Sequence, residues 1–467
     1  MRRTRIVCTL GPSSTQAGVL RRMISAGMDV ARFNFSHGDE ETHRHAVQLV
    51  RDAAAATGRH VALMQDLQGP KIRTNRLAHP LVRLVRGSKV TLTSRDVIGD
   101  ESRVGIDQPV VLQELRPRDR VLLVDGQIEL RVSGCDGVEA TCQVVRGGLL
   151  GEHKGVAVPG RPLDLPPFTD KDLRDLRIGA ALGFDYTALS FVRSAADVRR
   201  CRAAMAEAGV TTPIIAKLER SQALTRLPEI IDEVDGVMVA RGDLGVELSL
   251  GEVPAAQKDI IQRANTRGVP VITATEMLES MVTSNRPTRA EASDVANAIW
   301  DGTDAVMLSQ ETSIGAHPAE AVRAMARICL AAERHPAYQR QQHGWMEGSV
   351  ASAMAHAAAG IATEVGARAI IAFTETGSTA LHVSKTRPRV PVIAASPHLS
   401  VLRRTALYSG VVPLQVEPAP DTDAMIANAA GAAKQSALVR ERDRVVVVAG
   451  VPPGRSGQTN LVKVESV

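Results

Sequence analysis

The sequence predicts an α/β protein: a (β/α)8 barrel with an inserted small β-barrel-like domain, followed by a C-terminal doubly wound α/β domain. Three observations lead to this prediction. First, eight short apolar runs alternate with amphipathic stretches of helical period. Second, from about Pro70 to Gly155 the helical period gives way to an alternation of apolar and polar residues. Third, a new series of apolar runs and helical stretches follows a polar segment near residue 340.

The eight runs of the first series predict parallel strands. They are Ile6–Leu10, Asp29–Asn34, Val61–Asp66, Tyr186–Ser190, Pro213–Lys217, Gly236–Ala240, Pro270–Ala274 and Asp304–Leu308. The helices expected between them include Glu40–Thr57, Thr169–Leu182 with Thr169 as N-cap, Ala195–Ala208, Val253–Arg267, Arg289–Trp300 and Pro318–Glu333. Eight strands, each followed by a helix, is the count of a (β/α)8 barrel.

The remaining segments predict two further domains. Strands expected in the inserted domain are Leu81–Val85, Lys89–Thr93, Val121–Val124, Ile128–Val132 and Val138–Val145. A polar linker is expected over His335–Gly348, and four strands beyond it, Ile370–Phe373, Val392–Ala395, Val411–Val416 and Val445–Ala449. The expected boundaries are therefore 1–69 and 156–340 for the barrel, 70–155 for the inserted domain and 345–467 for the C-terminal domain.

Composition excludes several classes of protein. The chain has 467 residues, several times the ~150 of one domain, and its net charge of +5 comes from mixed rather than clustered signs. Aromatic residues make up only 2%, which leaves few rings to stack on bases, so no nucleic-acid partner is expected. The sequence contains no run of 18 apolar residues, so no membrane partner is expected. The five cysteines, Cys8, Cys135, Cys142, Cys201 and Cys329, form no C-x-x-C pair, and a reducing cytoplasm is the expected location.

Polar side chains gather where the predicted barrel strands end. In a (β/α)8 barrel, reactive groups come from the carboxyl ends of the strands and the loops that follow. The residues at these positions are Arg32, Asn34, Ser36, Asp66, Lys217, Glu219, Arg241, Gly242, Asp243, Thr275, Glu276 and Ser309. Any one of them could be an ordinary polar strand end. Together they place cations, carboxylates and hydroxyls on one rim.

Three rim residues suggest metal and phosphate chemistry. Glu219 and Asp243 come from adjacent βα units, and two carboxylates with water and substrate oxygens are the usual way of holding Mg²⁺. Asp243 could instead cap a helical turn. Lys217 ends an apolar run, and the chain contains nine lysines against 47 arginines. The choice of lysine there favours a compact charge beside a metal and a phosphate, although a lysine that merely extends its amine to solvent is the simpler alternative.

Two Gly-rich turns occur in the C-terminal domain, whereas the chain has neither a Walker A sequence nor G-x-G-x-x-G. The turn Thr374–Thr379 follows a predicted strand and opens a helix, and Gly454–Thr459 lies near the C-terminus. Backbone N–H groups and hydroxyls at a helix start can bind an anion. An ordinary capped turn is the alternative.

Motifs along nearly the whole chain resemble the pyruvate kinase family. They are Thr4–Ser14 (TRIVCTLGPSS), Arg32–Gly38 (RFNFSHG), Asp66–Arg73 (DLQGPKIR), Lys154–Val156, Ile214–Glu219 (IIAKLE), Arg241–Glu247 (RGDLGVE), and the run from Pro287 through Ser293–Asn297 to Met307–Ser309. The resemblance implies a barrel, an inserted domain that acts as a lid, and a C-terminal effector domain, in a homotetramer. The implied reaction is phosphoryl transfer from phosphoenolpyruvate to ADP, giving pyruvate and ATP in glycolysis.

The resemblance also implies roles for individual residues. Arg32 and Lys217 would act on the phosphoryl group, and Glu219 and Asp243 would hold Mg²⁺ or Mn²⁺. Gly242 and Thr275 would contact the substrate carboxylate, and Thr275 with Ser309 would relay the proton. The nucleotide would face His37, Arg73 and Lys154. A phosphorylated metabolite would bind the C-terminal loop through Thr374, Thr376, Gly377, Ser378 and Thr379.

The sequence departs from the family pattern at two places. Glu276 and Gln310 stand where Gln and Gly are usual, next to the two hydroxyls of the proton relay. Leu67, Gln68 and Lys71 replace the Thr, Lys and Glu of members that need K⁺. The monovalent-cation pocket implied by the resemblance comprises Asn34, Ser36, Asp66 and Leu67. We expect the Lys71 ammonium to fill it, so that K⁺ is not required.

Two other functions are compatible with parts of this pattern. A barrel that senses sugar phosphates without turnover would not need an intact Arg32, Lys217, Glu219 and Asp243. A metal-dependent lyase acting on C–C bonds at an enolate would explain the carboxylate pair and leave the lid residues Arg73 and Lys154 without a purpose. Sequence alone specifies neither the effector, the oligomeric state nor the preferred nucleoside diphosphate.

Overall fold

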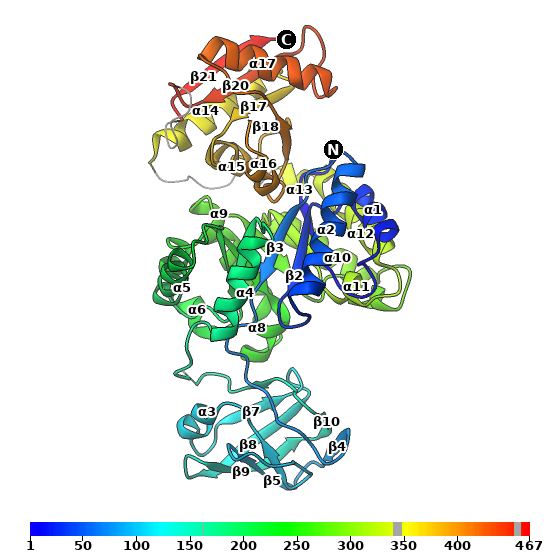
Figure 1. The fold of residues 1–467 in the computed structure, drawn as a ribbon, viewed down its shortest axis with the longest axis vertical. Helices are drawn as coiled ribbons and strands as arrows, with labels where there is room; N and C mark the ends of the chain where they lie inside the picture. The colour runs from blue at the N-terminus through cyan, green and yellow to red at the C-terminus, as the bar shows by residue number, and fades with distance from the viewer. Residues whose placement is uncertain (162, 340–347, 453–458) are drawn as a thin grey trace.

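A computed structural model describes residues 1–161, 163–339, 348–452 and 459–467. The chain forms three bodies in a row: the C-terminal domain at one end, the barrel in the middle and the inserted β domain at the other end (Figure 1). The (β/α)8 barrel and the C-terminal α/β domain expected from the sequence are therefore both present. No helix in these ranges has the length and hydropathy needed to cross a bilayer.

The barrel is closed by eight parallel strands in the order β1-β16-β15-β14-β13-β12-β3-β2. Their bounds are β1 Arg5–Thr9, β2 Val30–Asn34, β3 Ala62–Asp66, β12 Tyr186–Leu189, β13 Ile214–Leu218, β14 Gly236–Ala240, β15 Val271–Ala274 and β16 Ala305–Leu308. Each differs from its predicted bounds by two residues at most. The prediction of eight barrel strands is confirmed.

Helices surround the barrel. They are α1 Ala17–Ala26, α2 Glu40–Ala56, α4 Asp170–Ala181, α5 Ala195–Glu207, α6 Ser221–Thr225, α7 Leu227–Ile231, α8 Arg241–Glu247, α9 Val253–Thr266, α10 Arg289–Asp301, α11 Gln310–Ser313, α12 Pro318–Arg334 and α13 Pro336–Gln339, with a 3₁₀ turn at Glu279–Val282. Thr169 caps α4 as predicted, since its hydroxyl accepts from the Asp172 N–H while the Asp172 carboxylate accepts from the Thr169 N–H. The linker expected over His335–Gly348 contains α13, and its residues 340–347 lie outside the described ranges.

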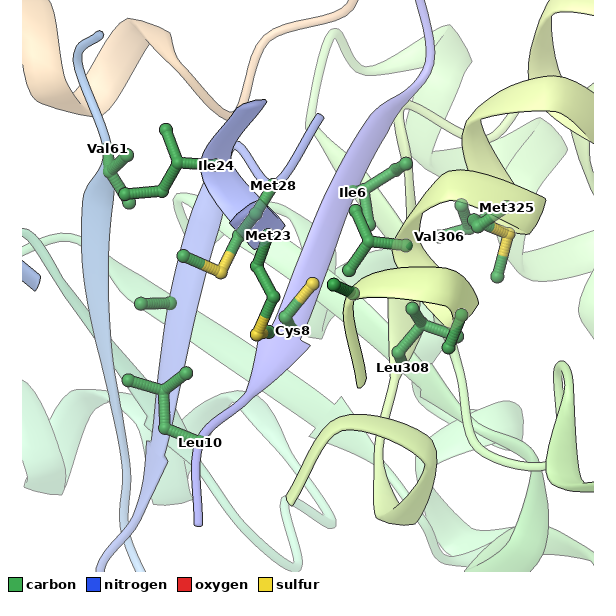
Figure 2. Packing of buried hydrophobic residues seen from close by; sticks show 14 of the residues in the cluster. Ile6, Cys8, Leu10, Met23, Ile24, Met28, Val61, Val306, Leu308 and Met325 are labelled. Carbon is green, nitrogen blue, oxygen red and sulfur yellow. The ribbon is translucent and has the colours of Figure 1, made fainter. Parts of the chain in front are cut away.

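Side chains of each barrel strand alternate between the two layers of the fold. Ile6, Cys8 and Leu10 belong to a cluster with Met23 of α1 and Met325 of α12 (Figure 2). The intervening Val7 belongs to a second cluster with other strand residues inside the barrel. Because both faces of these strands are buried, they read as continuous apolar runs in the sequence.

The inserted domain contains a six-stranded sheet in the order β11-β7-β8-β9-β5-β6 and a two-stranded sheet β10-β4. The bounds are β4 Leu81–Leu84, β5 Lys89–Thr93, β6 Arg103–Gly105, α3 Pro109–Glu114, β7 Arg120–Leu123, β8 Ile128–Cys135, β9 Glu139–Arg146, β10 Gly148–Gly151 and β11 Val156–Ala157. All five predicted strands are present, and β6, β10, β11 and the short α3 are additional. We call this body the lid domain.

The C-terminal domain is a five-stranded sheet in the order β19-β18-β17-β20-β21. Its elements are α14 Val350–Glu364, β17 Ala369–Phe373, α15 Ser378–Lys385, β18 Val392–Ser396, α16 Leu399–Thr405, β19 Val411–Gln415, α17 Thr422–Gln435, β20 Arg444–Ala449 and β21 Leu461–Ser466. Ile370 packs in a cluster with Ala355 of α14, whereas Ile371 packs in one with Ala429 of α17, so helices cover both faces. The antiparallel edge strand β21 was not predicted.

A buried ion pair joins the C-terminal domain to the barrel. The Lys385 ammonium, at the end of α15, donates to Asp304 Oδ2 at 2.9 Å and to Asn265 Oδ1 at 2.5 Å. Asp304 precedes β16 and also accepts from the Val271 N–H. Both side chains of the pair are 1% exposed. Removing one partner of such a pair is costly because the remaining charge stays buried.

Replacement of Lys385 tests this junction. Lys385→Met is expected to lower the free energy of unfolding by about 3 kcal/mol. In the matched control Lys434→Met, the lost pair with Glu441 is a surface pair whose lysine side chain is 47% exposed. This control is expected to cost less than about 1 kcal/mol. Urea denaturation followed by circular dichroism compares the two variants, and equal losses would contradict a structural role of the buried pair.

Candidate active site

Lys217 lies at the centre of the polar rim formed by the carboxyl ends of the strands. Its strand β13 is buried, and its side chain is 12% exposed. The ammonium lies 2.8 Å from Glu219 Oε1 and 3.2 Å from Asp66 Oδ1, and donates to Ser190 Oγ at 2.8 Å. Lys217 therefore does not simply extend to solvent: its charge is held in place by groups from β3, the end of β12 and the loop after β13.

The carboxylates keep this ammonium charged. Burial lowers the pKa of Lys217, but Asp66 and Glu219 outweigh it and raise the pKa above its usual value. Burial raises the pKa of Asp66, but Arg32 and Lys217 together bring it below its usual value. The mouth of the barrel thus holds fixed charges of both signs with little surrounding water.

Arg32 lies in the middle of β2, next to β3. Its Nε donates to Asp66 Oδ2 at 2.6 Å and its Nη1 to Thr9 Oγ1 at 2.8 Å. The side chain is 12% exposed. Arg32 and Lys217 therefore bind opposite oxygens of one buried carboxylate, which spaces the two cations along the rim.

Glu219 and Asp243 fit the requirements of a hard divalent cation. Burial raises the pKa of Glu219, and Asp243 contributes to the rise, against the opposing effect of Lys217. A divalent cation between the two carboxylates would offset the cost of their charge. Two carboxylates with remaining positions for water and phosphate oxygens is the usual Mg²⁺ arrangement. Asp243 lies within the first turn of α8 rather than at its N-cap, which is Ala240, so it is not a cap of this helix.

Backbone in the left-handed region shapes the rim after β15. Thr275 has φ of 68° and Glu276 of 52°, an unfavourable conformation for residues with a side chain. The Arg241 guanidinium donates to the carbonyls of Thr275 at 2.8 Å and Glu276 at 3.0 Å. The Thr275 hydroxyl in turn accepts from the Gly242 N–H at 2.7 Å. Arg241, itself paired with Asp294 at 2.6 Å, thus positions Thr275 beside Gly242.

Ser309 follows β16 on the same rim. Its hydroxyl is buried and has no hydrogen-bond partner among the residues that the structure describes. Its backbone N–H donates to Glu311 Oε2 at 2.6 Å. A buried hydroxyl without a partner is unfavourable and is characteristic of a site that a ligand completes.

The nucleotide residues inferred from the resemblance lie on two domains. Arg73 and Lys154 lie in the lid domain, where Arg73 Nη1 donates to the His153 carbonyl at 2.9 Å and Lys154 is exposed. His37 is exposed in the loop after β2. No contact between these three residues is present among the described residues.

A narrow cleft separates the lid domain from the rim. Lys71, Asp125 and Gly155 line it from the lid side, and Glu219, Asp243 and Arg220 from the barrel. Arg220 pairs with Glu247 at 2.5 Å and lies over the Phe191 ring. The lid domain and the two carboxylates therefore line the same cleft.

The expected contact of Lys71 with the monovalent-cation pocket is absent from the described residues. Both carboxylate oxygens of Asp66 are engaged by Arg32 and Lys217 instead. The Leu67 carbonyl accepts from the Ser190 hydroxyl at 2.7 Å, and Asn34 Oδ1 accepts from the Ser36 N–H at 3.1 Å. Lys217, on β13 and two strands away from β3, reaches Asp66 instead, and Lys71 lines the lid cleft. The expectation that Lys71 fills the pocket stays a prediction.

The predicted effector loop Thr374–Thr379 lines a pocket of about 670 Å³ in the C-terminal domain. The Thr374 hydroxyl accepts from the Gly377 N–H at 2.8 Å, and Gly377 has φ of 99°. Thr376 and Ser378 are exposed, and Thr379 pairs with Thr459 at 2.9 Å. His382, His398, Glu375 and Glu417 also line the pocket. Residues 454–458 of the second Gly-rich turn lie outside the described ranges.

Sequence reasoning missed Ser190 and the positioning role of Arg241. Ser190 is the last residue of a predicted barrel strand, and this position could have marked it as a rim residue. A serine after an apolar run is too common to be singled out. Arg241 was predicted to lie at the rim. Its positioning role depends on the left-handed backbone conformation of Thr275 and Glu276, whose carbonyls it binds, and no pattern in the sequence predicts that conformation.

Comparison with known proteins agrees with this geometry. Family models described as the pyruvate kinase barrel domain and the pyruvate kinase alpha/beta domain match residues 1–322 and 352–465. The chain is 45% identical to pyruvate kinase 2 of Synechocystis over 100% of this chain and 79% of that protein. It is 43% identical to pyruvate kinase of Corynebacterium glutamicum over 99% and 97% of the two chains.

A solved structure supports the same assignment. The crystal structure of a pyruvate kinase from Cryptosporidium parvum superposes with a TM-score of 0.92 at 36% identity, covering 100% of this chain and 96% of that one. Fold, rim chemistry and sequence similarity over both matched domains agree: this chain belongs to the pyruvate kinase family.

Proposed function

We propose that this chain transfers the phosphoryl group of phosphoenolpyruvate to ADP at the barrel mouth and protonates the resulting enolate to give pyruvate. The observation that carries the proposal is the buried ammonium of Lys217, held between Asp66 and Glu219 with the Arg32 guanidinium beside it. Transfer between two polyanions requires positive charge fixed along the path of the phosphoryl group more than it requires covalent chemistry.

Arg32 and Lys217 divide this work. Arg32 presents a planar guanidinium that can bind phosphoryl oxygens of the bound substrate. The Lys217 ammonium is a point charge directed at the oxygens while the group moves. Since Asp66 already holds both cations, neither has to reorganise when charge develops.

Glu219 and Asp243 would hold the divalent ion, Mg²⁺ or Mn²⁺. When bound, that ion supplies positive charge to phosphoryl and carboxylate oxygens of the substrate. Lys217 contacts Glu219 at 2.8 Å, so the ammonium and the ion site share one carboxylate. This common ligand keeps the cations of the site within reach of one phosphoryl group.

Gly242 and Thr275 would bind the substrate carboxylate, with Arg241 fixing the Thr275 backbone. Protonation of the enolate would involve the hydroxyls of Thr275 and Ser309. The two departures from the family pattern, Glu276 and Gln310, have exposed side chains. Their exposure supports a relay that tolerates both substitutions.

His37, Arg73 and Lys154 would contact the ADP or ATP phosphates and base when the lid closes. A sensor without turnover is the alternative function, and no observation at the rim favours it. Release of pyruvate from phosphoenolpyruvate, followed with coupled lactate dehydrogenase with and without ADP, decides between them. Pyruvate formed only with ADP supports the proposal, and its absence under both conditions contradicts it.

The family resemblance extends the proposal to assembly and location. We infer a homotetramer in the cytoplasm, regulated by a phosphorylated metabolite at the loop Thr374–Thr379. A pocket of about 670 Å³ with threonine and serine hydroxyls at a helix start supports a phosphate site there.

Replacing the central cation tests the transfer step. Lys217→Met should lower kcat by at least ~10²-fold and change KM for phosphoenolpyruvate much less, because the ammonium acts on charge that develops during transfer. Steady-state kinetics measure both constants. Lys258→Met, which removes a surface lysine side chain that is 60% exposed, is the matched control and should retain activity. A near-normal kcat in Lys217→Met would contradict the role.

We further propose that turnover does not require K⁺. Lys71 lines the same cleft as Glu219 and Asp243 and adds a positive charge to it. The family resemblance implies Glu at this position in members that need K⁺. Activity is expected to be similar in K⁺ and in tetramethylammonium chloride. In Lys71→Glu, K⁺ should stimulate activity, whereas the exposed lid variant Lys89→Glu should behave like the unmodified enzyme. Strong K⁺ stimulation of the unmodified enzyme would refute this proposal.

The effector proposal predicts a shift of the phosphoenolpyruvate saturation curve. A hexose bisphosphate, a hexose monophosphate and AMP are the probes, and at least one should shift the curve. Ser378→Asp should abolish the shift, since a carboxylate at the helix start repels phosphate. Ser436→Asp adds the same charge on the exposed end of α17 and should keep it. An unaltered shift in Ser378→Asp, or no shift with any probe, would overturn the proposal.

A further inference from the structure

A second cavity lies between the barrel and the C-terminal domain, away from both sites described above. Its volume is about 320 Å³, and it is lined by Arg3, Glu333, Arg334, Tyr338, Arg387 and Arg389, among others. The N-terminus and α13 lie at this junction (Figure 1). The cavity is of a size that admits a small metabolite.

Positive charge dominates this cavity. Four guanidinium groups line it against the single carboxylate of Glu333, and that carboxylate accepts from the backbone N–H groups of Arg3 and Thr4. The Arg3 guanidinium donates to the carbonyls of Pro388 and Arg389. Within the described ranges, the side chains of Arg334 and Arg389 have neither an ion pair nor a hydrogen bond. Two arginine side chains are therefore available to a ligand.

Arg387 also lines this cavity. Its side chain is 6% exposed, and Nη2 pairs with Asp304 Oδ1 at 2.8 Å. The same Nη2 donates to the Gly302 carbonyl at 2.8 Å. Nε and Nη1, in contrast, are buried and have no hydrogen-bond partner within the described part of the chain. Buried charged donors without partners are rare and costly.

The backbone of Arg387 adds to this cost. It has φ of 51° just after the C-cap of α15, at a point where helices commonly place glycine. A side chain at a left-handed position disfavours the fold slightly unless its contacts compensate. The contact with Asp304 uses only one of the three guanidinium nitrogens.

We propose that this cavity, which we call the junction pocket, binds a small phosphomonoester. Arg387 contributes a positive charge to the wall of the cavity, and a guanidinium suits phosphate oxygens. Arg334 and Arg389 supply two further positive charges, which suit the dianionic phosphate group better than a monocarboxylate. The chain thus has a phosphate site distinct from the loop Thr374–Thr379 and from the active site.

Arg387 connects the junction pocket to the barrel. It contacts Asp304, the residue directly before β16, and Ser309 on the active-site rim directly follows the last residue of β16, Leu308. Binding at the pocket should therefore also change the phosphoenolpyruvate saturation curve. This kinetic consequence rests on the proposed function, whereas binding itself does not.

The test is isothermal titration calorimetry of the full-length protein with three probes: glucose 6-phosphate, inorganic phosphate and citrate. Ser378→Asp serves as the background in every titration, because it blocks the other loop. Glucose 6-phosphate should bind saturably and more tightly than citrate. The double variant Arg334→Ala/Arg389→Ala should bind it at least tenfold more weakly. Arg22→Ala, an exposed arginine in an open surface groove, is the matched control and should bind normally.

Circular dichroism of the double variant should match that of the unmodified protein, which shows that weaker binding does not come from unfolding. Citrate binding as tight as that of glucose 6-phosphate would overturn the phosphomonoester assignment. Absence of binding by any probe, or unaltered binding in the double variant, would overturn the site. None of these results would affect the formation of pyruvate from phosphoenolpyruvate and ADP. If the proposed function were wrong, no pyruvate would form, and the calorimetric result would be unchanged.

Discussion

The active-site rim depends on the pairing of one buried carboxylate with two cations. Asp66 holds Arg32 at 2.6 Å and Lys217 at 3.2 Å, and is itself 1% exposed. Cations left without this partner would repel each other in a poorly solvated site. With it, the cluster of Asp66, Arg32, Lys217 and Glu219 balances in charge and gains a net positive charge only when a divalent ion binds. Such an arrangement suits a substrate that brings its own negative charge.

The barrel provides the geometry for this pairing. Asn34 is in register with Asp66 between β2 and β3, and Asp66 with Ala188 between β3 and β12. Because neighbouring parallel strands end at the same edge, residues separated by more than a hundred positions in the chain meet without long loops. Arg241 then fixes the left-handed turn at Thr275, so the rim is rigid where substrate atoms must be positioned.

The eight barrel strands were predictable from the sequence because they are buried on both faces and appear as uninterrupted apolar runs. The edge strand β21 has no buried residue, and β6 has only three residues, so neither leaves such a signal. Strand ends likewise predicted Arg32, Asp66, Lys217 and Glu219 as neighbours. The place of Lys71 in the lid cleft was not predictable, because Lys71 follows the last predicted strand residue by five positions, across Gly69 with φ of 66°, and the direction of that turn is set by tertiary contacts.

Strand β16 connects the chemistry to the C-terminal domain. Asp304, just before it, is held by Lys385 and Arg387 from the C-terminal domain, and Ser309, just after it, lies on the rim. A β-strand of four residues is nearly extended and has little freedom to absorb a displacement at one end. The same hydrophobic cluster includes Met307 of β16 and Ala380 of α15, so movement between the domains has to repack buried side chains as well as ion pairs. Packed interfaces of this kind favour discrete arrangements over gradual deformation, which makes the junction at Asp304 a physical connection between the C-terminal domain and Ser309 on the rim.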